Sequence, residues 1–335
     1  MGQDGMQPRP SQPERGVTMR PAMDLSTEIL RADRGGIARA AALLAQGALV
    51  AFPTETVYGL GGDAQNGTAV ADIFATKGRP SFNPLIIHVA DSDAAQQFVI
   101  WNDTAEVLTA AYWPGPLTIV LPLRDGHGLS SLVTAGLSTV AVRVPAHPAA
   151  TALLREFGGP VAAPSANPSG KISPTTAAHV AAGLSGRIAA ILDEGPCAVG
   201  LESTIIGLDG PATLLRAGGI PSEAVEQALG HPLAQAPEGI TAPGQLVSHY
   251  APDAPMRLSA REVRGDEVML GFGASAGDMT LSASGNLHEA AARLFDMLHM
   301  LNAYKRPIAV APIPETGLGR AINDRLRRAA APRQA

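Results

Sequence analysis

The sequence predicts an α/β protein: a twisted, mixed parallel and antiparallel sheet with flanking helices, followed by a small Rossmann-like parallel α/β domain. Three observations support this fold class. Apolar stretches of strand length alternate with helical segments along the chain. The strands expected at 117–123, 139–144 and 203–215 are joined by connections too short for the crossovers of a strictly parallel sheet. Strand–helix–strand–helix order then resumes after a proline-rich segment at 230–255.

The larger part begins with an alanine-rich helix at 35–46 that leads into a buried strand at 48–52. A second helix is expected at 67–77, because its apolar residues have helical spacing and Gly78 and Pro80 follow it. Further strands are expected at 85–89, 117–123, 139–144, 161–163, 188–192, 203–208 and 212–215, and further helices at 147–157, 175–183 and 222–229.

The smaller part has a long helix whose apolar stripe includes Leu287, Leu294 and Leu298. Its elements are expected in the order strand 267–272, helix 287–304, strand 307–311 and helix 317–329. The chain is therefore expected to divide into a disordered leader at 1–23, a main domain at 24–229, a proline-rich linker at 230–255 and a small domain at 256–335.

The composition narrows the class of protein. Hydrophobic residues make up 46% and charged residues 16% of the chain, which is typical of a soluble globular protein. The formal net charge of −5 argues against a surface devoted to nucleic-acid backbone, but it leaves room for a local basic pocket. The single Cys197 excludes a disulfide framework, and a buried small residue is its simplest interpretation. No stretch is typical of a signal peptide or a membrane span, so we expect a cytoplasmic protein.

The segment PTETVYGLG at 53–61 is the first candidate for a cleft lining. If it is extended, Thr54, Thr56 and Tyr58 share one face, and the glycines let a ligand approach the backbone. An ordinary passage from a strand to a turn explains the same residues equally well.

The segment KGRPSFNPLIIH at 77–88 joins a helix to a strand. Lys77 could merely cap the carbonyl end of its helix, whereas Arg79 lies beyond that end. Two cations that converge there suit a polyphosphate, because arginine supplies a fork and lysine a point charge. Asn83 could simply start a turn, and a histidine such as His88 at the end of an apolar strand is more often a satisfied core residue.

Further polar residues follow on later strands and loops. Arg143 faces one side of an inner strand, where it needs either a bound anion or a salt-bridge partner, and both alternatives remain open. Ser165 and Asn167 lie two residues apart in a loop that three prolines constrain. The same loop and the strands after it supply further candidates: Lys171, Ser173, Glu202, Ser203, Thr204 and Arg216.

Together these residues predict a cationic, hydroxyl-lined cleft that binds a nucleotide phosphate. The chain has no G-x-x-x-x-G-K-[ST] loop, no H-E-x-x-H motif and no G-x-S-x-G motif. It also shows no evident pair of nucleophile and base. Positioning and charge stabilisation are therefore the expected means of catalysis.

The ordered motifs PTETVYGLG, KGRP, NPLIIH, WPGPLT, VRVP, PSAN and ESTII closely resemble those of the YrdC-like threonylcarbamoyl-AMP synthases. HYAP in the linker and the terminal PETGLGRAINDRLRRAA resemble the long form with an extra C-terminal domain, so that the resemblance covers residues 25–330. It implies a nucleotidyltransferase that converts L-threonine, bicarbonate and ATP, with Mg²⁺, into L-threonylcarbamoyladenylate and pyrophosphate. A tRNA threonylcarbamoyl-transfer complex would use the product beside the anticodon, without stable tRNA binding by this chain.

The resemblance also implies roles for individual residues. A catalytic tetrad falls on Lys77, Arg79, Ser165 and Asn167. ATP contacts fall on these four and on Asn83, Thr139, Ser173, Arg216 and Tyr250. L-Threonine contacts fall on Thr56, His88, Arg143, Ala163 and Ser203. Mg²⁺ would be held mainly by the ATP phosphates, with no protein ligand assigned, and the linker with Tyr250 would close over the cleft.

Two other functions are compatible with this kind of fold. One is an RNA-binding module without ATP turnover. The net negative charge of the chain argues against it. The other is a carbamoyl-transfer domain of hydrogenase maturation, which needs an acylphosphatase domain and cysteine zinc-finger motifs that this sequence lacks. Pyrophosphate release that requires both L-threonine and bicarbonate would separate the three functions.

Overall fold

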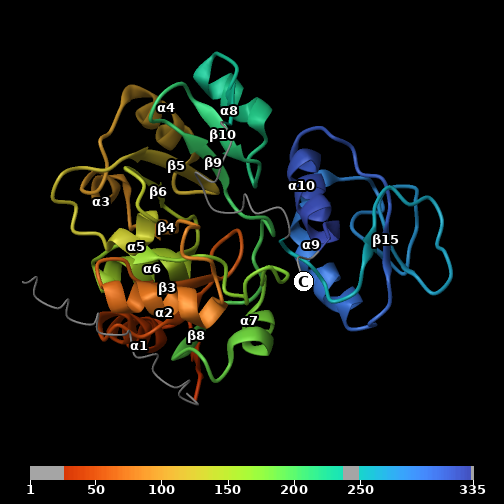
Figure 1. Cartoon of the computed structure of the whole chain (residues 1–335), viewed down its shortest axis with the longest axis horizontal. Coiled ribbons are helices and arrows are strands. Elements are labelled where there is room, and N and C mark those ends of the chain that lie inside the picture. Colours follow the sequence, from red (N-terminus) through yellow and green to blue (C-terminus); the bar gives the residue numbers. More distant parts are fainter. Residues whose placement is uncertain (1–25, 237–248, 333–335) are drawn as a thin grey trace, which may run out of the picture.

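The computed structural model describes residues 26–236 and 249–332, which form two sheets (Figure 1). The predicted leader at 1–23 and the middle of the predicted linker, 237–248, lie outside the described residues. The boundaries of the predicted domains stay predictions. Within the described ranges, no helix has the length and apolar character needed to cross a membrane.

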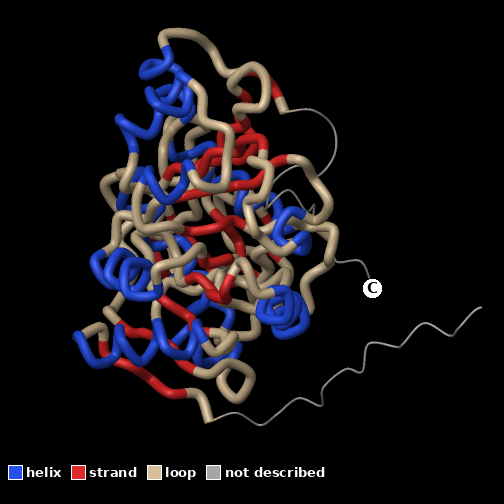
Figure 2. The backbone as a smooth tube through the Cα atoms, turned by 90° about the vertical axis from the view of Figure 1, so that its left-hand side faces the viewer, coloured by secondary structure: helices blue, strands red, loops and turns tan. Residues whose placement is uncertain are grey.

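The larger sheet mixes parallel and antiparallel pairs among its described strands, as predicted. In spatial order the strands are β1 (Glu28–Arg31), β8 (Ala190–Asp193), β2 (Val50–Phe52), β3 (Gly59–Asp63), β7 (Val161–Ala162), β4 (Ile86–His88), β6 (Thr139–Arg143), β5 (Leu117–Pro122), β9 (Thr204–Gly207), β10 (Thr213–Arg216) and β11 (Ala234–Gln235). β6 runs parallel to β4 and antiparallel to β5, which in turn runs parallel to β9. Figure 2 shows the strands in the middle of the molecule with helices around them.

Helices flank this sheet, and aliphatic side chains fill the space on both of its faces. The helices are α1 (Arg34–Ala45), α2 (Gly67–Lys77), α3 (Ser92–Gln96), α4 (Asp103–Tyr112), α5 (Ser131–Thr134), α6 (Pro148–Phe157), α7 (Ala177–Leu184) and α8 (Ser222–Leu229). On β2, Ala51 packs into one hydrophobic cluster, while Val50 and Phe52 pack into another. Successive residues of a strand point to opposite faces, so the sheet separates two cores.

The smaller part is a parallel sheet with two helices, as predicted. Its strands, in spatial order, are β12 (Met256–Arg257), β15 (Ile308–Val310), β13 (Val268–Gly271) and β14 (Met279–Thr280). The helices are α9 (Leu287–Asn302) and α10 (Leu318–Ala330). Both lie on the side of the small sheet that faces the larger part (Figure 1). Gly200 shows how close this approach is, because a Cβ atom there would lie 2.5 Å from the Ala291 carbonyl oxygen of α9.

Several elements were not predicted from the sequence, among them β1, α4 and β3. β3 was missed because three of its five residues are glycines, which disfavour strands. Tertiary packing explains the glycines: a Cβ atom at Gly61 would lie 2.9 Å from side-chain carbons of Phe52 and Val161. The segment at 53–61 is therefore irregular up to Tyr58 and becomes a strand at Gly59.

Candidate active site

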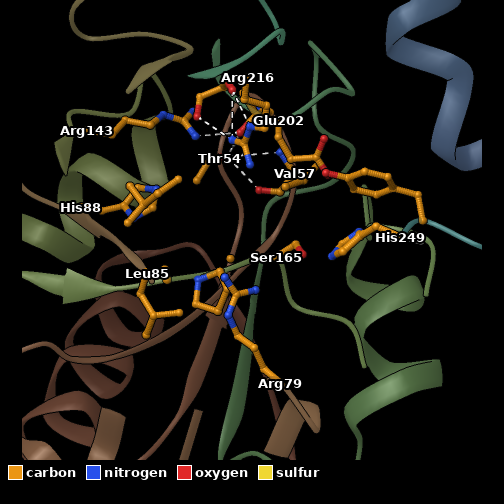
Figure 3. A pocket seen from close by; sticks show the side chains of 17 residues that line it. Thr54, Val57, Arg79, Leu85, His88, Arg143, Ser165, Glu202, Arg216 and His249 are labelled. Atoms are coloured by element: carbon orange, nitrogen blue, oxygen red, sulfur yellow. Dashed lines mark hydrogen bonds between the residues drawn. The ribbon is translucent and has the colours of Figure 1, made fainter. Parts of the chain in front are cut away.

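A pocket lies where β3, β4 and β6 meet the loops that follow β7 and precede β9 (Figure 3). Arginines and hydroxyl groups share its lining with the apolar side chains of Val57, Leu85 and Ile86. Four residues of the predicted ATP set line it: Arg79, Ser165, Arg216 and Tyr250. All five residues of the predicted L-threonine set line it as well: Thr56, His88, Arg143, Ala163 and Ser203.

Arg143 projects from β6 into the pocket and is already paired. Its Nη2 lies 2.7 Å from Oε1 of Glu55, Nη1 donates to Oγ1 of Thr56 at 2.9 Å, and Nε donates to the Gly115 carbonyl at 3.1 Å. The Arg143 and Glu55 side chains are only 4% and 9% exposed. Each charge therefore compensates the burial of the other. The sequence left two alternatives open for Arg143, a salt-bridge partner or a bound anion. The salt bridge is present, and the same guanidinium also lines the pocket.

The threonines of the 53–61 segment form a small hydroxyl network beside Arg143. Oγ1 of Thr54 donates to the Val57 carbonyl at 2.7 Å and lies 2.7 Å from Oγ1 of Thr56. Tyr58 does not join them, because its hydroxyl donates to the Gly195 carbonyl at 2.8 Å and burial raises its pKa. Thr54 and Thr56 thus belong to the pocket lining, while Tyr58 supports the fold behind it.

Lys77, the last residue of α2, lies behind the pocket lining. Its Nζ donates to the carbonyls of Ser165 at 2.6 Å and Asn167 at 2.5 Å. Burial lowers the pKa of Lys77 well below its usual value, and the charge of Arg79 lowers it further. Gly78, in the left-handed region with φ of 63°, caps the helix instead. Lys77 therefore fixes the backbone of the loop that carries two predicted catalytic residues.

Arg79 enters the pocket from the turn after α2. Its Nε donates to the Asn83 carbonyl at 3.2 Å and its Nη2 to the Pro84 carbonyl at 2.8 Å. Burial lowers the pKa of Arg79 to about 10, which still leaves it charged at neutral pH. Within the described residues no carboxylate forms a salt bridge with it, so its positive charge is directed at the pocket.

Two buried asparagines lie next to these cations with incomplete hydrogen bonding. Asn83 is fully buried, and neither atom of its side-chain amide has a partner among the described residues. Nδ2 of Asn167 donates to the carbonyls of Pro168 and Lys171, both at 2.9 Å, while its Oδ1 lacks a partner in the same part of the chain. Buried polar atoms are normally paired, so these amides indicate groups that a ligand would complete.

Arg216, the last residue of β10, contributes the third pocket arginine. Its Nε and Nη2 donate to the Ser203 carbonyl at 3.1 and 3.0 Å, and Nη2 also donates to Oγ of Ser203 at 3.1 Å. Oγ of Ser203 lies 2.6 Å from Oγ1 of Thr118. Burial lowers the pKa of Arg216 to about 10, so it too is charged at neutral pH.

His88, at the end of β4, is both a core residue and a pocket residue. Its ring packs edge-on against Phe52 with centroids 6.1 Å apart. Burial, helped by the charge of Arg143, lowers the pKa of His88 to about 3. Its Nδ1 lacks a hydrogen-bond partner among the described residues. His88 is therefore neutral and can offer an uncharged polar atom to a substrate.

His249 and Tyr250, the first described residues after the gap, lie in the pocket wall. Both are buried, and their ring centroids are 4.1 Å apart. Tyr250 has a left-handed φ of 64°, which is uncommon for a residue other than glycine. The backbone on either side is held from two directions: N–H of His249 donates to the Arg328 carbonyl at 3.2 Å, and N–H of Ala251 donates to the Gly170 carbonyl at 2.8 Å.

The remaining residues of the predicted ATP set do not line this pocket: Lys77, Asn83, Thr139, Asn167 and Ser173. Two of them contact residues that line the pocket: Nζ of Lys77 donates to the Ser165 carbonyl, and Oγ of Ser173 donates to Oε1 of Glu202 at 2.6 Å. Thr139 begins β6, at the opposite end of the strand from Arg143.

Glu202, which the sequence named as a candidate without a role, and His249, which it did not assign, both line the pocket. His249 directly precedes the assigned Tyr250 in the motif HYAP, which was the available signal. No cluster of three His, Cys, Asp or Glu residues that could hold a metal ion occurs in the described ranges. Oε2 of Glu202 lies 2.8 Å from Nε of Arg325, so this carboxylate of the lining is already engaged.

Comparisons with known proteins agree over both parts of the chain. A family model described as telomere recombination, the Sua5/YciO/YrdC model, matches residues 42–218, and one described as the C-terminal domain of threonylcarbamoyl-AMP synthase matches residues 220–331. The threonylcarbamoyl-AMP synthase of Bacillus subtilis is 42% identical and covers 91% of this chain and 95% of its own length. That of Pyrococcus abyssi is 41% identical, with coverages of 87% and 92%.

Solved structures give the same result. The crystal structure of P. abyssi Sua5 complexed with L-threonine superposes with a TM-score of 0.82 at 38% identity, and covers 91% of this chain and 97% of that one. E. coli YciO matches with a TM-score of 0.52 at 19% identity over 58% of this chain and 96% of its own, which shows a shared fold only.

Proposed function

This chain belongs to the Sua5/YrdC family of threonylcarbamoyl-AMP synthases, and we propose that it converts L-threonine, bicarbonate and ATP into L-threonylcarbamoyladenylate and pyrophosphate. One observation carries the proposal: Arg79, Arg143 and Arg216 line a single buried pocket with the hydroxyls of Ser165 and Ser203. Guanidinium groups in such a cluster bind phosphates and carboxylates. The L-threonine in the complex of the similar P. abyssi protein supports the amino-acid substrate.

ATP would bind in the pocket through Arg79 and Arg216, which both line it. The charge of Arg79, which no carboxylate neutralises in the described residues, suits a phosphate. The incompletely bonded amide of Asn83 would gain its partners from the nucleotide. The full set that we propose for ATP is Lys77, Arg79, Asn83, Thr139, Ser165, Asn167, Ser173, Arg216 and Tyr250.

L-Threonine would bind in the same pocket at Arg143. Glu55, Thr56 and Gly115 hold the guanidinium of Arg143 in one orientation, in which it would clamp the substrate carboxylate. His88 is kept neutral by burial, so its Nδ1 would contact the substrate without adding charge. The full set that we propose for L-threonine is Thr56, His88, Arg143, Ala163 through its backbone, and Ser203.

The reaction would proceed in two bond-forming steps. The amine nitrogen of L-threonine attacks the carbon of bicarbonate, and water leaves as the carbamate forms. A carbamate oxygen then attacks the α-phosphorus of ATP while the bond to the bridging oxygen of pyrophosphate breaks. Both reactants are anions, so the pocket cations offset their repulsion and stabilise charge on the leaving group. Lys77, Arg79, Ser165 and Asn167 would form the catalytic tetrad, in which Lys77 holds the loop of the other two.

Mg²⁺ would enter with the ATP phosphates as part of the substrate, since hard cations favour phosphate oxygens and the carboxylate of the lining is held by Arg325. His249 and Tyr250, which line the pocket, would cover the adenylate and keep water from hydrolysing it. The product would pass in the cytoplasm to a complex that transfers the threonylcarbamoyl group to tRNA, without stable tRNA binding by this chain.

Pyrophosphate release tests the proposed function. We expect release from ATP only when L-threonine and bicarbonate are both present. Arg79→Ala should lower the rate about a hundredfold or more, because it removes charge stabilisation at the site. Lys77→Ala should lower it by a similar factor, because it releases the loop that carries Ser165 and Asn167. Arg155→Ala, at an exposed arginine of α6, is the matched control and should keep the wild-type rate.

Other outcomes would count against the proposal. Release without L-threonine would contradict the reaction, and full activity of both site variants would make the catalytic assignment wrong. Salt-sensitive tRNA binding without ATP turnover would instead favour an RNA-binding module.

A further inference from the structure

The last helix places an arginine against the pocket of the larger part. Arg325 lies on α10, and its side chain is 0% exposed. Its Nε donates to Oε2 of Glu202 at 2.8 Å and its Nη2 to the Ala217 carbonyl at 3.0 Å, both in the larger part. Its Nη1 donates to Oδ2 of the neighbouring Asp324 at 2.7 Å. A planar guanidinium with three directed hydrogen bonds fixes the orientation of the groups that it holds.

Glu202 connects Arg325 to the substrate pocket. It lines the pocket, and its Oε1 accepts a hydrogen bond from Oγ of Ser173 at 2.6 Å. Burial alone would raise the pKa of Glu202, but Arg325, followed by Arg216 and Ser173, outweighs burial and lowers this pKa. The carboxylate is therefore ionised, with one oxygen on Arg325 and the other on Ser173. A continuous hydrogen-bonded chain runs from α10 to the loop of Ser173.

Arg325 also supports the pocket wall from behind. Its Cζ lies 5.2 Å from the centroid of the Tyr250 ring, and that ring lies 5.6 Å from the ring of Phe295 on α9. Val57 and Leu201 of the larger part pack in the same hydrophobic cluster as residues of α9 and α10. Residues of the smaller part therefore pack behind the wall of the pocket, and Arg325 places a buried positive charge there.

Without Arg325, the Glu202 carboxylate would have a second cation to pair with. Arg216 lines the same pocket, and the charges of Arg216 and Glu202 each shift the pKa of the other. Arg216 now donates to Ser203, and Glu202 pairs with Arg325. A carboxylate that turned to Arg216 would neutralise a cation of the proposed ATP site.

We propose that Arg325 is a positioning residue of the active site, which holds the Glu202 carboxylate on Ser173 and away from Arg216. Arg216 then stays directed at ATP, and the loop of Ser173 keeps its place. This inference rests on the proposed function and adds a dependence to it: the proposed contact of Arg216 with ATP requires a residue of the smaller part. Arg325 itself touches no substrate in this scheme.

Arg325→Met in the full-length chain tests the inference. The variant leaves the Glu202 carboxylate buried without the partner that orients it. We expect the KM for ATP to rise about tenfold to a hundredfold, as for other losses of positioning, while the KM for L-threonine changes much less. Pyrophosphate release with each substrate varied in turn measures both. Arg327→Met is the matched control: Arg327 is an exposed arginine of the same helix, paired with Glu315, and its loss should change neither value.

A second variant separates positioning from loss of folding. Arg325→Met/Glu202→Gln removes the stranded charge, so its KM for ATP should return toward that of Glu202→Gln alone. The KM of Arg325→Met should also fall as the pH is lowered from 8 to about 6, because protonation of Glu202 has the same effect, and the double variant should lack this pH dependence. The charged and titratable groups around Glu202 are Arg325, Asp324, Arg216, His249 and Tyr250. Thermal denaturation confirms that each variant is folded.

The outcomes distinguish this inference from the function on which it rests. If the wild type releases pyrophosphate and Arg325→Met has the KM for ATP of Arg327→Met, the inference is wrong and the proposed function stands. Equal rises in both KM values, with no recovery in the double variant, would show that Arg325 only joins the two parts, and would overturn it too. If the wild type releases no pyrophosphate, the proposed function fails. In that case the ATP affinity of each variant, measured by calorimetry, tests the inference. Equal ATP affinities of Arg325→Met and Arg327→Met would overturn it.

Discussion

Two buried arginine–glutamate pairs border the same pocket with opposite arrangements. Arg143 and Glu55 are 2.7 Å apart within the larger part, with 4% and 9% of their side chains exposed. Arg325 and Glu202 are 2.8 Å apart across the two parts, with 0% and 8% exposed. In the first pair the arginine lines the pocket and the glutamate lies behind it, and in the second pair the glutamate lines the pocket.

The difference shows that the pocket's charge depends on which partner lies behind its wall. Glu55 pairs with a cation that lines the pocket, whereas Arg325 pairs with an anion that, in our proposal, would otherwise turn to Arg216. Distance and burial are nearly the same in the two pairs, so neither quantity reveals these roles. Removal of the partners one at a time should reveal them.

Arg143→Met should have the largest effect of any single change to the two pairs. It leaves Glu55 buried without a counter-charge, which should lower the free energy of unfolding by about 3–5 kcal/mol. It also removes the proposed clamp for the substrate carboxylate, so we expect pyrophosphate release to fall about a hundredfold or more. Urea denaturation and the release assay measure the two effects separately.

The double variant Arg143→Met/Glu55→Gln sharpens the contrast with Arg325. It should recover stability, because the stranded charge is gone, but it should recover no activity, because the pocket cation is still missing. At the Arg325–Glu202 pair the corresponding double variant should recover ATP affinity. Recovered activity in the Arg143 double variant would mean that Arg143 only neutralises Glu55, and the proposed carboxylate clamp would be wrong.

The two arginines also differ in how far the sequence revealed them. Arg143 was recognisable because an arginine on an inner strand must have an anionic partner, although the identity of Glu55 depends on the tertiary fold. Arg325 sits in the run DRLRRAA, where it resembles its exposed neighbours. Helix phase distinguishes it: Leu318, Ile322 and Arg325 follow one another at spacings of a buried stripe, so a cation on that stripe was the missed signal.

The same limit applies to the rest of the fold and site. Hydrophobic periodicity and short strand connections predicted the mixed sheet, and motif resemblance assigned nine residues that line the pocket. The direction of individual side chains was not predictable. Lys77 reaches the carbonyls of a distant loop and Tyr58 the carbonyl of Gly195, and both contacts exist only after distant segments have packed.

The larger and the smaller part each bury a histidine whose titration should affect stability at low pH. His88 is buried in the larger part, while His299 of α9 stacks on His179 of α7 at 3.9 Å between ring centroids. Burial lowers the pKa of His88 to about 3 and that of His299 to about 4, from the usual 6.5. Below pH 6.5 the unfolded chain therefore binds more protons than the folded one. Each histidine should lower the free energy of unfolding by about 1.4 kcal/mol per pH unit as the pH falls toward its folded pKa.

Urea denaturation between pH 7 and pH 4 measures this loss. His299→Phe keeps a ring for stacking but cannot be protonated, so its stability should fall less steeply over the window from 6.5 to 4. His288→Phe, at an exposed position of the same helix, should keep the wild-type slope. An unchanged slope in His299→Phe would show that the contact between α9 and α7 adds nothing to acid sensitivity, and that residues of the larger part such as His88 account for it.

The smallest effect is expected for an exposed pair. It tests whether burial or distance determines how much an arginine–glutamate pair contributes to stability. Nη2 of Arg39 lies 2.6 Å from Oε1 of Glu28 and Nε lies 3.2 Å from Oε2, so this pair is bidentate and has a shorter contact than either buried pair. Its side chains are 46% and 40% exposed, so water solvates both charges before and after the pair is broken. Arg39→Met should therefore keep the wild-type Tm and rate of pyrophosphate release. A fall in Tm as large as that of Arg143→Met would show that the distance between the charged atoms matters more than their burial. The comparison of the two buried pairs would then be wrong.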